Sequence, residues 1–424
     1  MALMSATMVQ NTKIISLIGT GHGMSHFYGL ALAPLFPLIK IEFGVSYAAL
    51  GFLVTMLNIT GTIVQVPVGF LADRMGGRIL LPLGLGLMAF PFLAFGYADS
   101  YWFALALMAI AGIGSSVFHP VDYAILNATI EESFLGRAFS LHTFSGSIGV
   151  MIAPGAMVLL ASIWDWRTAL VIAGGFGIFF MLLMIANGHL LHGHGHGNAN
   201  KKKEIQKART STSATSGIKT LFLPQVLLMV IFYILITVMM SGILTFSVTI
   251  FNKFNGISLI DATTILTSYV IAGSVGLITG GILADKWNRH TLTAVSALLV
   301  SAVLLAVIDA FSLPVILLTA ALVVIGFLQA TIRPARDMIV RSIIPKDSMG
   351  KVFGFLSAAM SAGHAIAPVF IGWLIDRGNH DIIFYVLAVI MLLAIPTIAL
   401  AQSPTVVRGL EADTETATGK AAAE

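Results

Sequence analysis

The feature that most constrains this chain is its series of long apolar stretches. A helix needs about 20 apolar residues to cross the hydrocarbon core of a bilayer. Twelve stretches reach that length, at residues 14–39, 47–71, 79–97, 102–129, 138–162, 167–188, 221–250, 261–284, 291–309, 314–343, 351–376 and 383–402. The sequence therefore predicts an all-α polytopic membrane protein with twelve transmembrane helices.

The overall composition excludes several classes of protein. Hydrophobic residues make up 57% of the chain and charged residues 10%, whereas about a quarter of the residues in soluble domains are charged. Cysteine is absent, which excludes a disulfide framework and a thiolate metal site. No phosphate-cradling loop, nucleophile–base pair or metal-ligand spacing stands out along the chain. We therefore expect neither an enzyme nor a bound cofactor, and the sequence assigns no metal site.

A short polar motif between apolar stretches occurs twice. The first copy contains Gly69, Asp73, Arg74, Gly76 and Arg78. The second contains Gly281, Asp285, Lys286 and Arg289, and half the length of the 424-residue chain separates the two aspartates. Pro120 and Pro334, and likewise Pro154 and Pro368, repeat at nearly the same offset. Self-similarity at this period predicts two equivalent structural halves.

The duplicated motif resembles the loop signature of the major facilitator superfamily of secondary transporters, Gly-x-x-x-Asp-Arg-x-Gly-Arg-Arg. The first copy departs from it at Gly77, where the family usually has arginine, and the second has Asn288 in place of glycine. The resemblance covers nearly the whole chain. It implies two pseudo-symmetric six-helix bundles, here residues 1–188 and 221–402, with a cytoplasmic connector at 189–220 and a cytoplasmic tail at 403–424.

The distribution of lysine and arginine predicts the orientation in the membrane. The outer side would hold only Lys40, Arg167, Lys253 and Arg377, whereas both motif loops and the basic connector would face the cytoplasm. Both termini would then also be cytoplasmic, in what we expect to be a bacterial inner membrane. The basic cluster at 201–209 is explained by topology, so no nucleic-acid partner is expected. Members of the family normally work as monomers in lipid.

The motif loops are candidates for gating. In the family, the loop carboxylate holds the inner gate closed against the opposite half. The resemblance implies this role for Asp73 opposite Gly350 and Lys351, and for Asp285 opposite Gly136 and Arg137. The alternative is that these charges only fix the topology. The candidate gating residues are Gly69, Asp73, Arg74, Gly76, Arg78, Arg137, Asp285, Lys286 and Arg289.

Ionisable side chains occur at corresponding places in the fourth and tenth spans. His119, Pro120 and Asp122 lie in the fourth, and Arg333, Pro334, Arg336 and Asp337 lie in the tenth. Charged groups inside a membrane usually face a cavity or one another. Proline cannot donate to the helix ladder, so each copy is expected to kink its span. A structural charge network with Arg341 and a substrate or proton site both remain open.

Several histidines and other polar residues lie in the spans. His22 and His26 are four residues apart and therefore share one face of the first helix. Histidine suits proton coupling and also binds transition metals, but many intramembrane histidines are only hydrogen-bonded to a neighbouring helix. His142 lies near the start of the fifth span. The remaining candidates for substrate binding or proton coupling are Tyr28, Asn58, Tyr123, Tyr233, Gln329 and His364. The connector histidines 189, 192, 194 and 196 are interpreted as part of a solvated linker.

The segment 112–120, Gly-Ile-Gly-Ser-Ser-Val-Phe-His-Pro, resembles the fourth helix of the fosmidomycin-resistance branch of the superfamily. That branch is associated with efflux of small polar anionic antibiotics, and the resemblance implies efflux without transferring the substrate. Two arginines inside a span favour an anionic solute. The sequence thus predicts a secondary active transporter of a small polar, anionic solute, working by alternating access, driven by a proton gradient and directed outward. The alternatives are a carrier of transition metals or metal chelates that uses the intramembrane histidines, and a non-transporting membrane sensor.

Overall fold

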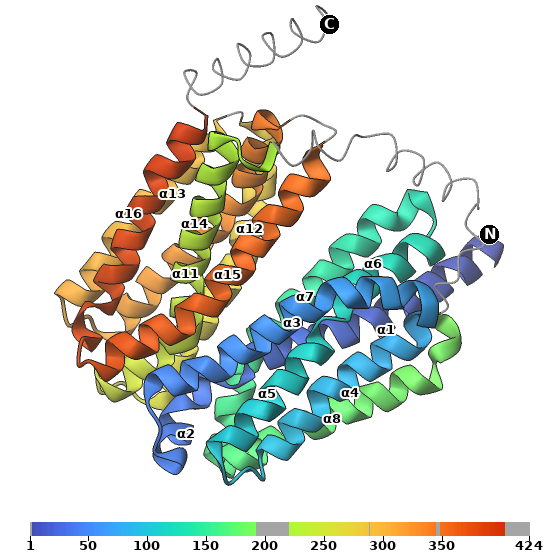
Figure 1. Ribbon diagram of the computed structural model, residues 1–424, viewed down its shortest axis with the longest axis horizontal. Coiled ribbons are helices and arrows are strands. Elements are labelled where there is room, and N and C mark those ends of the chain that lie inside the picture. The colour runs from blue at the N-terminus through green and yellow to red at the C-terminus, as the bar shows by residue number, and fades with distance from the viewer. Residues whose placement is uncertain (1, 192–219, 288, 345–347, 403–424) are drawn as a thin grey trace, which may run out of the picture. The chain divides into compact units, whose positions relative to one another are not determined.

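The computed structural model describes residues 2–191, 220–287, 289–344 and 348–402, without the side chains of residues 2–7, 73, 132 and 133. Within these ranges every regular element is a helix, as Figure 1 shows. The first part of the chain forms α1 (Ala2–Ala31), η1 (Ala33–Leu35), α2 (Phe36–Phe43), α3 (Tyr47–Met75), α4 (Gly77–Phe95), α5 (Tyr101–Ser115), α6 (Phe118–Thr129), α7 (Glu132–Ile163), α8 (Trp166–Ala186) and η2 (Gly188–Leu190). The second part forms α11 (Pro224–Lys253), α12 (Leu259–Lys286), α13 (His290–Ala310), α14 (Val315–Ile343), α15 (Met349–Asp376), η4 (His380–Ile382) and α16 (Ile383–Ala401).

Twelve candidate membrane spans lie in the described part of the chain, each long and apolar enough to cross a bilayer. This confirms the number expected from the sequence. Three of the spans are made of consecutive helices: Met8–Phe43 contains α1, η1 and α2, Tyr101–Thr129 contains α5 and α6, and His380–Ala401 contains η4 and α16. The break between α5 and α6 falls at Ser116 and Val117, so Pro120 lies in the first turn of α6. The expected interruption near Pro120 is therefore found, whereas α14 continues through Pro334 as one helix.

The chain divides into two compact units. Unit 1 comprises Met1–Glu204, Gly242–Thr267 and His364–His380, and unit 2 comprises Ile205–Ser241, Ser268–Gly363 and Asp381–Glu424. Helices α11, α12 and α15 therefore contribute to both units. This division does not test the boundaries expected from the sequence, which stay a prediction. The connector beyond residue 191 and the tail from residue 403 lie outside the described residues.

Close backbone contacts build the helix packing of unit 1. Helix α7 packs along α1, where a Cβ at Gly149 would lie 2.0 Å from the carbonyl oxygen of Gly23. Without a strong hydrophobic force between helices in lipid, small residues stabilise such pairs by letting the backbones approach. Gly149 of α7 therefore has a packing role against α1.

The C-terminal part of α15 joins unit 1 through contacts with α3. The Asp376 carboxylate accepts hydrogen bonds from the backbone N–H groups of Tyr47 and Ala48, at 2.8 and 2.9 Å. These donors are in the first turn of α3, where backbone N–H groups have no partner within the helix. Further along, the Thr55 hydroxyl donates to the carbonyl of Ala365 at 2.7 Å. These contacts explain why residues 364–380 belong to the first unit.

Candidate functional site

Two groups of polar side chains lie on the membrane helices, one in each unit. The histidine cluster of unit 1 consists of His22, His26, His119, Asp122 and His142. The arginine cluster of unit 2 consists of Tyr233, Tyr269, Gln329, Arg333, Arg336 and Asp337. Each is described from the helices that carry it.

Three helices supply the histidine cluster. His22 and His26 lie one turn apart on α1, His119 and Asp122 lie in the first turns of α6, and His142 lies on α7. Gly146 makes the arrangement sterically feasible, because a Cβ there would lie 2.9 Å from both the Nε2 atom of His22 and the Cδ2 atom of His26. The glycine face of α7 thus leaves room for the imidazoles of α1.

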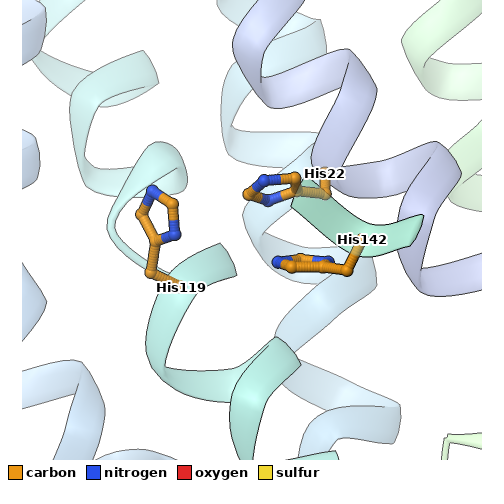
Figure 2. Close-up of side chains that lie close together, drawn as sticks. All are labelled: His22, His119 and His142. Carbon is orange, nitrogen blue, oxygen red and sulfur yellow. The ribbon is translucent and has the colours of Figure 1, made fainter. Parts of the chain in front are cut away.

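The rings of the cluster are in mutual contact, as Figure 2 shows for His22, His119 and His142. The rings of His22 and His142 lie one above the other, with centroids 3.8 Å apart, and His119 faces this pair at 5.2 Å from His22. The His26 ring lies 4.6 Å from that of His22. Tyr123 stacks on His119 at 6.4 Å. His22, His26, His119, Asp122 and Tyr123, which the sequence offered only as separate candidates, thus lie together as one set of side chains.

The centre of the cluster is buried but poorly hydrogen-bonded. The side chain of Asp122 has no exposed surface, and its Oδ2 atom lies 3.3 Å from Nδ1 of His22 and 3.8 Å from Nε2 of His142. Neither contact has hydrogen-bond geometry. Nδ1 of His22, both carboxylate oxygens of Asp122 and both ring nitrogens of His142 have no hydrogen-bond partner. Buried polar atoms are usually paired because an unpaired one costs about 1–3 kcal/mol, so this concentration indicates a binding site.

His142 is the member of the cluster that the sequence did not assign to a site. It lies on the same face of α7 as Gly146 and Gly149, four and seven residues later. That spacing marks the face that approaches another helix, and it is the pattern from which a role for His142 could have been predicted. Which helix packs there is not encoded in the spacing.

The arginine cluster contains one neutralised arginine. The Nε atom of Arg336 lies 3.0 Å from Oδ1 of Asp337, and the Tyr233 hydroxyl donates to the same oxygen at 3.0 Å. The Arg336 guanidinium also lies over the Tyr233 ring, 4.3 Å from its centroid. Part of the charge network expected from the sequence is therefore present, and it lies within the tenth span and α11.

Arg333 has a different environment. Its Nη2 atom donates to the sulfur of Met240 at 3.1 Å, and no carboxylate of the described residues lies within 4.0 Å of it. A thioether sulfur is a weak acceptor. The residue is exposed, one turn from Arg336 on the same helix. Close to it in sequence, Gln329 is buried and accepts from the Tyr269 hydroxyl at 2.6 Å. Arg333 is thus a guanidinium with unused hydrogen-bonding capacity on an accessible side of α14.

The other candidates lie elsewhere. Tyr28 is buried and donates to the backbone carbonyl of Ala173 at 2.9 Å, which fits a packing role between α1 and α8. Asn58 is half-buried on α3, and His364 is half-buried on α15.

The first motif loop connects α3 and α4. Gly76 ends α3 with φ 73°, a left-handed value that favours glycine. A Cβ at Gly77 would lie 2.2 Å from Cδ1 of Ile125, so a side chain at this position, where the family usually has arginine, would require the Ile125 side chain to move. Arg74, Arg78 and Arg137 are exposed and Gly69 is unobstructed. The side chain of Asp73 lies outside the described residues.

The second motif loop follows α12. Asp285, Lys286 and Arg289 are exposed, and Asp285 lines a pocket of about 300 Å³ whose wall also contains Pro334, Asp337 and Arg341. This pocket belongs to unit 2. The gating partners expected for Asp73 and Asp285 stay predictions.

Comparisons with known proteins place the chain in context. A family model described as Major Facilitator Superfamily matches residues 16–263 and 235–422. The fosmidomycin resistance protein of Escherichia coli (strain K12) is 25% identical over 92% of this chain and 93% of its own length. The membrane sensor protein UhpC of the same organism is 21% identical over 89% of this chain and 88% of its own length, and the uncharacterized MFS-type transporter YfnC of Bacillus subtilis (strain 168) is 23% identical over 86% and 87%.

A solved structure has a similar fold. The bacterial homolog of the human lysosomal transporter Spinster, in an inward-facing and unoccupied conformation, matches with a TM-score of 0.74 and 14% sequence identity. The likeness covers 93% of this chain and 99% of that one. It confirms the twelve-helix membrane fold expected from the apolar stretches.

Proposed function

The chain belongs to the Major Facilitator Superfamily, as its duplicated loop motif suggested, and we propose that it exports a small polar anion by alternating access, driven by a proton gradient. Membership makes it an integral membrane protein of a transporter family and not an enzyme. The class of solute, the direction, the coupling ion and a bacterial inner-membrane location are the parts proposed here.

The observation that carries the proposal is the environment of Arg333. Its guanidinium has a methionine sulfur as hydrogen-bond partner and no carboxylate within salt-bridge distance among the described residues. An arginine inside a membrane span is costly and usually faces a partner or a cavity. Guanidinium offers a planar pair of donors that matches carboxylate and phosphate groups. An anionic group on the solute would supply the missing partner.

The neighbouring pair explains why Arg333 alone is assigned this role. Arg336, one turn away, is already neutralised by Asp337 and stacked on Tyr233. The two arginines together would repel each other without that carboxylate. With Arg341 included, α14 carries three arginines and one aspartate and is therefore net positive, which suits an anionic group.

The likeness to the fosmidomycin resistance protein supports the outward direction. At 25% identity it does not identify the solute. The proton gradient is supported by the ionisable side chains within spans, His22, His119 and Asp122 among them, since such groups mark proton relays in many transporters. Collapse of the gradient by an ionophore should abolish uphill movement of the solute, and undiminished accumulation would refute proton coupling.

A thermal-shift screen of the purified protein tests the anion assignment. The panel contains small carboxylates, phosphonates and phosphate esters, with amino acids and neutral sugars as comparison. A ligand that binds the folded state raises the melting temperature by mass action. We expect an anion to stabilise the wild type and Arg377→Ala, a matched loss of an exposed arginine, but not Arg333→Ala. Equal stabilisation of Arg333→Ala would remove the basis of the proposal.

A sensor without transport is the second candidate, because UhpC is named a membrane sensor protein. Both candidates require a solute site, so binding does not separate them. Flux does: a sensor would bind the anion in proteoliposomes without moving it across the bilayer.

A further inference from the structure

A three-histidine group in unit 1 carries an inference that goes beyond anion transport. His22, His119 and His142 each offer one ligand nitrogen, and these nitrogens all lie within 4.8 Å of one another. The residues come from α1, α6 and α7 and face one another in Figure 2. We propose that they bind a divalent transition-metal ion, such as Zn²⁺ or Co²⁺, beside the carboxylate of Asp122.

The donor set fits this class of ion. Imidazole nitrogen is a preferred ligand of Zn²⁺, Co²⁺ and Ni²⁺, whereas Mg²⁺ and Ca²⁺ prefer oxygen. Three protein ligands with a further position left open is the donor count of many zinc sites. Cysteine is absent from the chain, so no thiolate is available, and the imidazole of histidine is the side chain that suits these ions.

The distances require a modest adjustment. With a Zn–N distance of about 2.0–2.1 Å, ligand nitrogens in a tetrahedral site are about 3.3 Å apart. The nitrogens of His22, His119 and His142 would have to close from at most 4.8 Å. His22 and His142 are buried at 3% and 1% exposure, but His119 is exposed and follows the break between α5 and α6. His119 therefore has the freedom to move onto an ion held by the other two.

The carboxylate of Asp122 adds a negative charge that would compensate part of the charge of a divalent ion. Its Oδ2 atom lies between His22 and His142, at 3.3 and 3.8 Å from their nearest nitrogens. Carboxylates beside ligating histidines orient the ring and increase its basicity, or bind the metal directly. An ion at this place would compensate a fully buried carboxylate that has no hydrogen bond on either oxygen.

Packing alone does not account for the group. A histidine kept for packing is expected to satisfy its buried nitrogens with a neighbouring helix. Here neither nitrogen of His142 has a partner, although the residue is almost fully buried. Since the ligands lie on three separate helices, their spacing along the sequence does not show a metal site.

The test measures Co²⁺ binding to the purified full-length protein after chelator treatment. Visible absorption of the bound ion reports its coordination, and equilibrium dialysis gives the stoichiometry. The connector histidines are a competing site, so His189, His192, His194 and His196 are first replaced by asparagine. In this background we expect one Co²⁺ per chain. The additional change His119→Gln should weaken binding at least about tenfold, as loss of even an outer-shell partner does.

His364→Gln is the matched control, because it removes a histidine of another span. It should leave Co²⁺ affinity unchanged. Each variant must have the same elution volume in size-exclusion chromatography and the same melting temperature as the protein without the connector histidines. If His119→Gln fails that check, His142→Gln takes its place. The proposal would be overturned if replacing the connector histidines abolished all Co²⁺ binding. It would also be overturned if His119→Gln left the Co²⁺ affinity and the absorption spectrum unchanged. The result is separate from anion binding, so either assignment can fail without the other.

Discussion

Residues 118–122 of α6 and residues 332–336 of α14 occupy corresponding places in the two halves of the sequence, and each has a basic side chain followed by proline. Their structures differ. In the first, the span breaks before His119, and a buried carboxylate lies among imidazoles without hydrogen bonds. In the second, the helix continues, and Asp337 neutralises one of two arginines. The same repeated pattern therefore contributes possible metal ligands in unit 1 and the unpaired guanidinium of Arg333 in unit 2.

The difference in charge pairing follows from the residue that comes directly after each copy of the repeat, Tyr123 in the first and Asp337 in the second. The second copy has Asp337 next to Arg336, so a pair forms within one helix. The first copy has Tyr123 in that place, and Asp122 meets only histidines of other helices. The two clusters should therefore respond independently to substitution and to ligand.

The largest expected effect is that substitutions in the two clusters change the affinities for the anion and for Co²⁺ independently. Arg333→Gln should weaken the binding of the stabilising anion by about 10–100-fold, the value of one or two hydrogen bonds to a charged group, and should leave Co²⁺ binding unchanged. His119→Gln should do the reverse. Both affinities are measured by titration of each purified variant, with Arg377→Ala as control. A variant that loses both ligands would show that the two clusters act as one site.

The two prolines should differ in their effect on stability. Pro334 lies inside α14, so Pro334→Ala restores a backbone donor and removes a steric conflict, and we expect a stabilisation of about 1–3 kcal/mol. Pro120 lies in the first turn of α6, where proline is tolerated, so Pro120→Ala should change stability little. Melting temperatures in one detergent give the comparison. A larger gain for Pro120→Ala would contradict the assigned helix break.

The two carboxylates should also differ. Asp337→Asn leaves Arg336 without its partner, and because Asp337 is 45% exposed we expect a loss of only about 1 kcal/mol. Asp122→Asn removes a buried charge that has no hydrogen bond, so its melting temperature in metal-free buffer should equal or exceed that of the wild type. A marked destabilisation by Asp122→Asn would mean that this carboxylate is paired in the folded protein.

The smallest effect is expected for a hydroxyl. Tyr233→Phe removes one hydrogen bond to Asp337 and should cost about 1 kcal/mol. Tyr28→Phe removes a comparable bond to the backbone of Ala173 and should cost a similar amount. The two variants should lower the melting temperature alike but differ in anion affinity. Only Tyr233→Phe should alter it, because Tyr233 contacts Arg336 and Asp337, one turn from Arg333. Equal anion affinities would separate Tyr233 from the solute site.

The sequence predicted the twelve spans because the length of an apolar stretch is a local property. It also named His22, His119 and Asp122 as candidates, but it did not bring them together, because their meeting depends on how α1 packs against α6. It did not assign His142, because the packing of α7 on α1 depends on tertiary contacts. It also left open whether Arg333 and Arg336 were equivalent, because pairing with Asp337 depends on rotamers. The glycine at 77 departed from the family pattern, and its close neighbour, the side chain of Ile125, became visible only in the structure.

Anion flux tests the central claim most directly. The protein is reconstituted in proteoliposomes, a pH gradient is imposed, and uptake of the stabilising anion is followed for the wild type, Arg333→Gln and Arg377→Ala. We predict gradient-driven accumulation by the wild type and Arg377→Ala, and a rate at the level of empty liposomes for Arg333→Gln. Binding without flux in the wild type, or equal flux in Arg333→Gln, would contradict the proposed function.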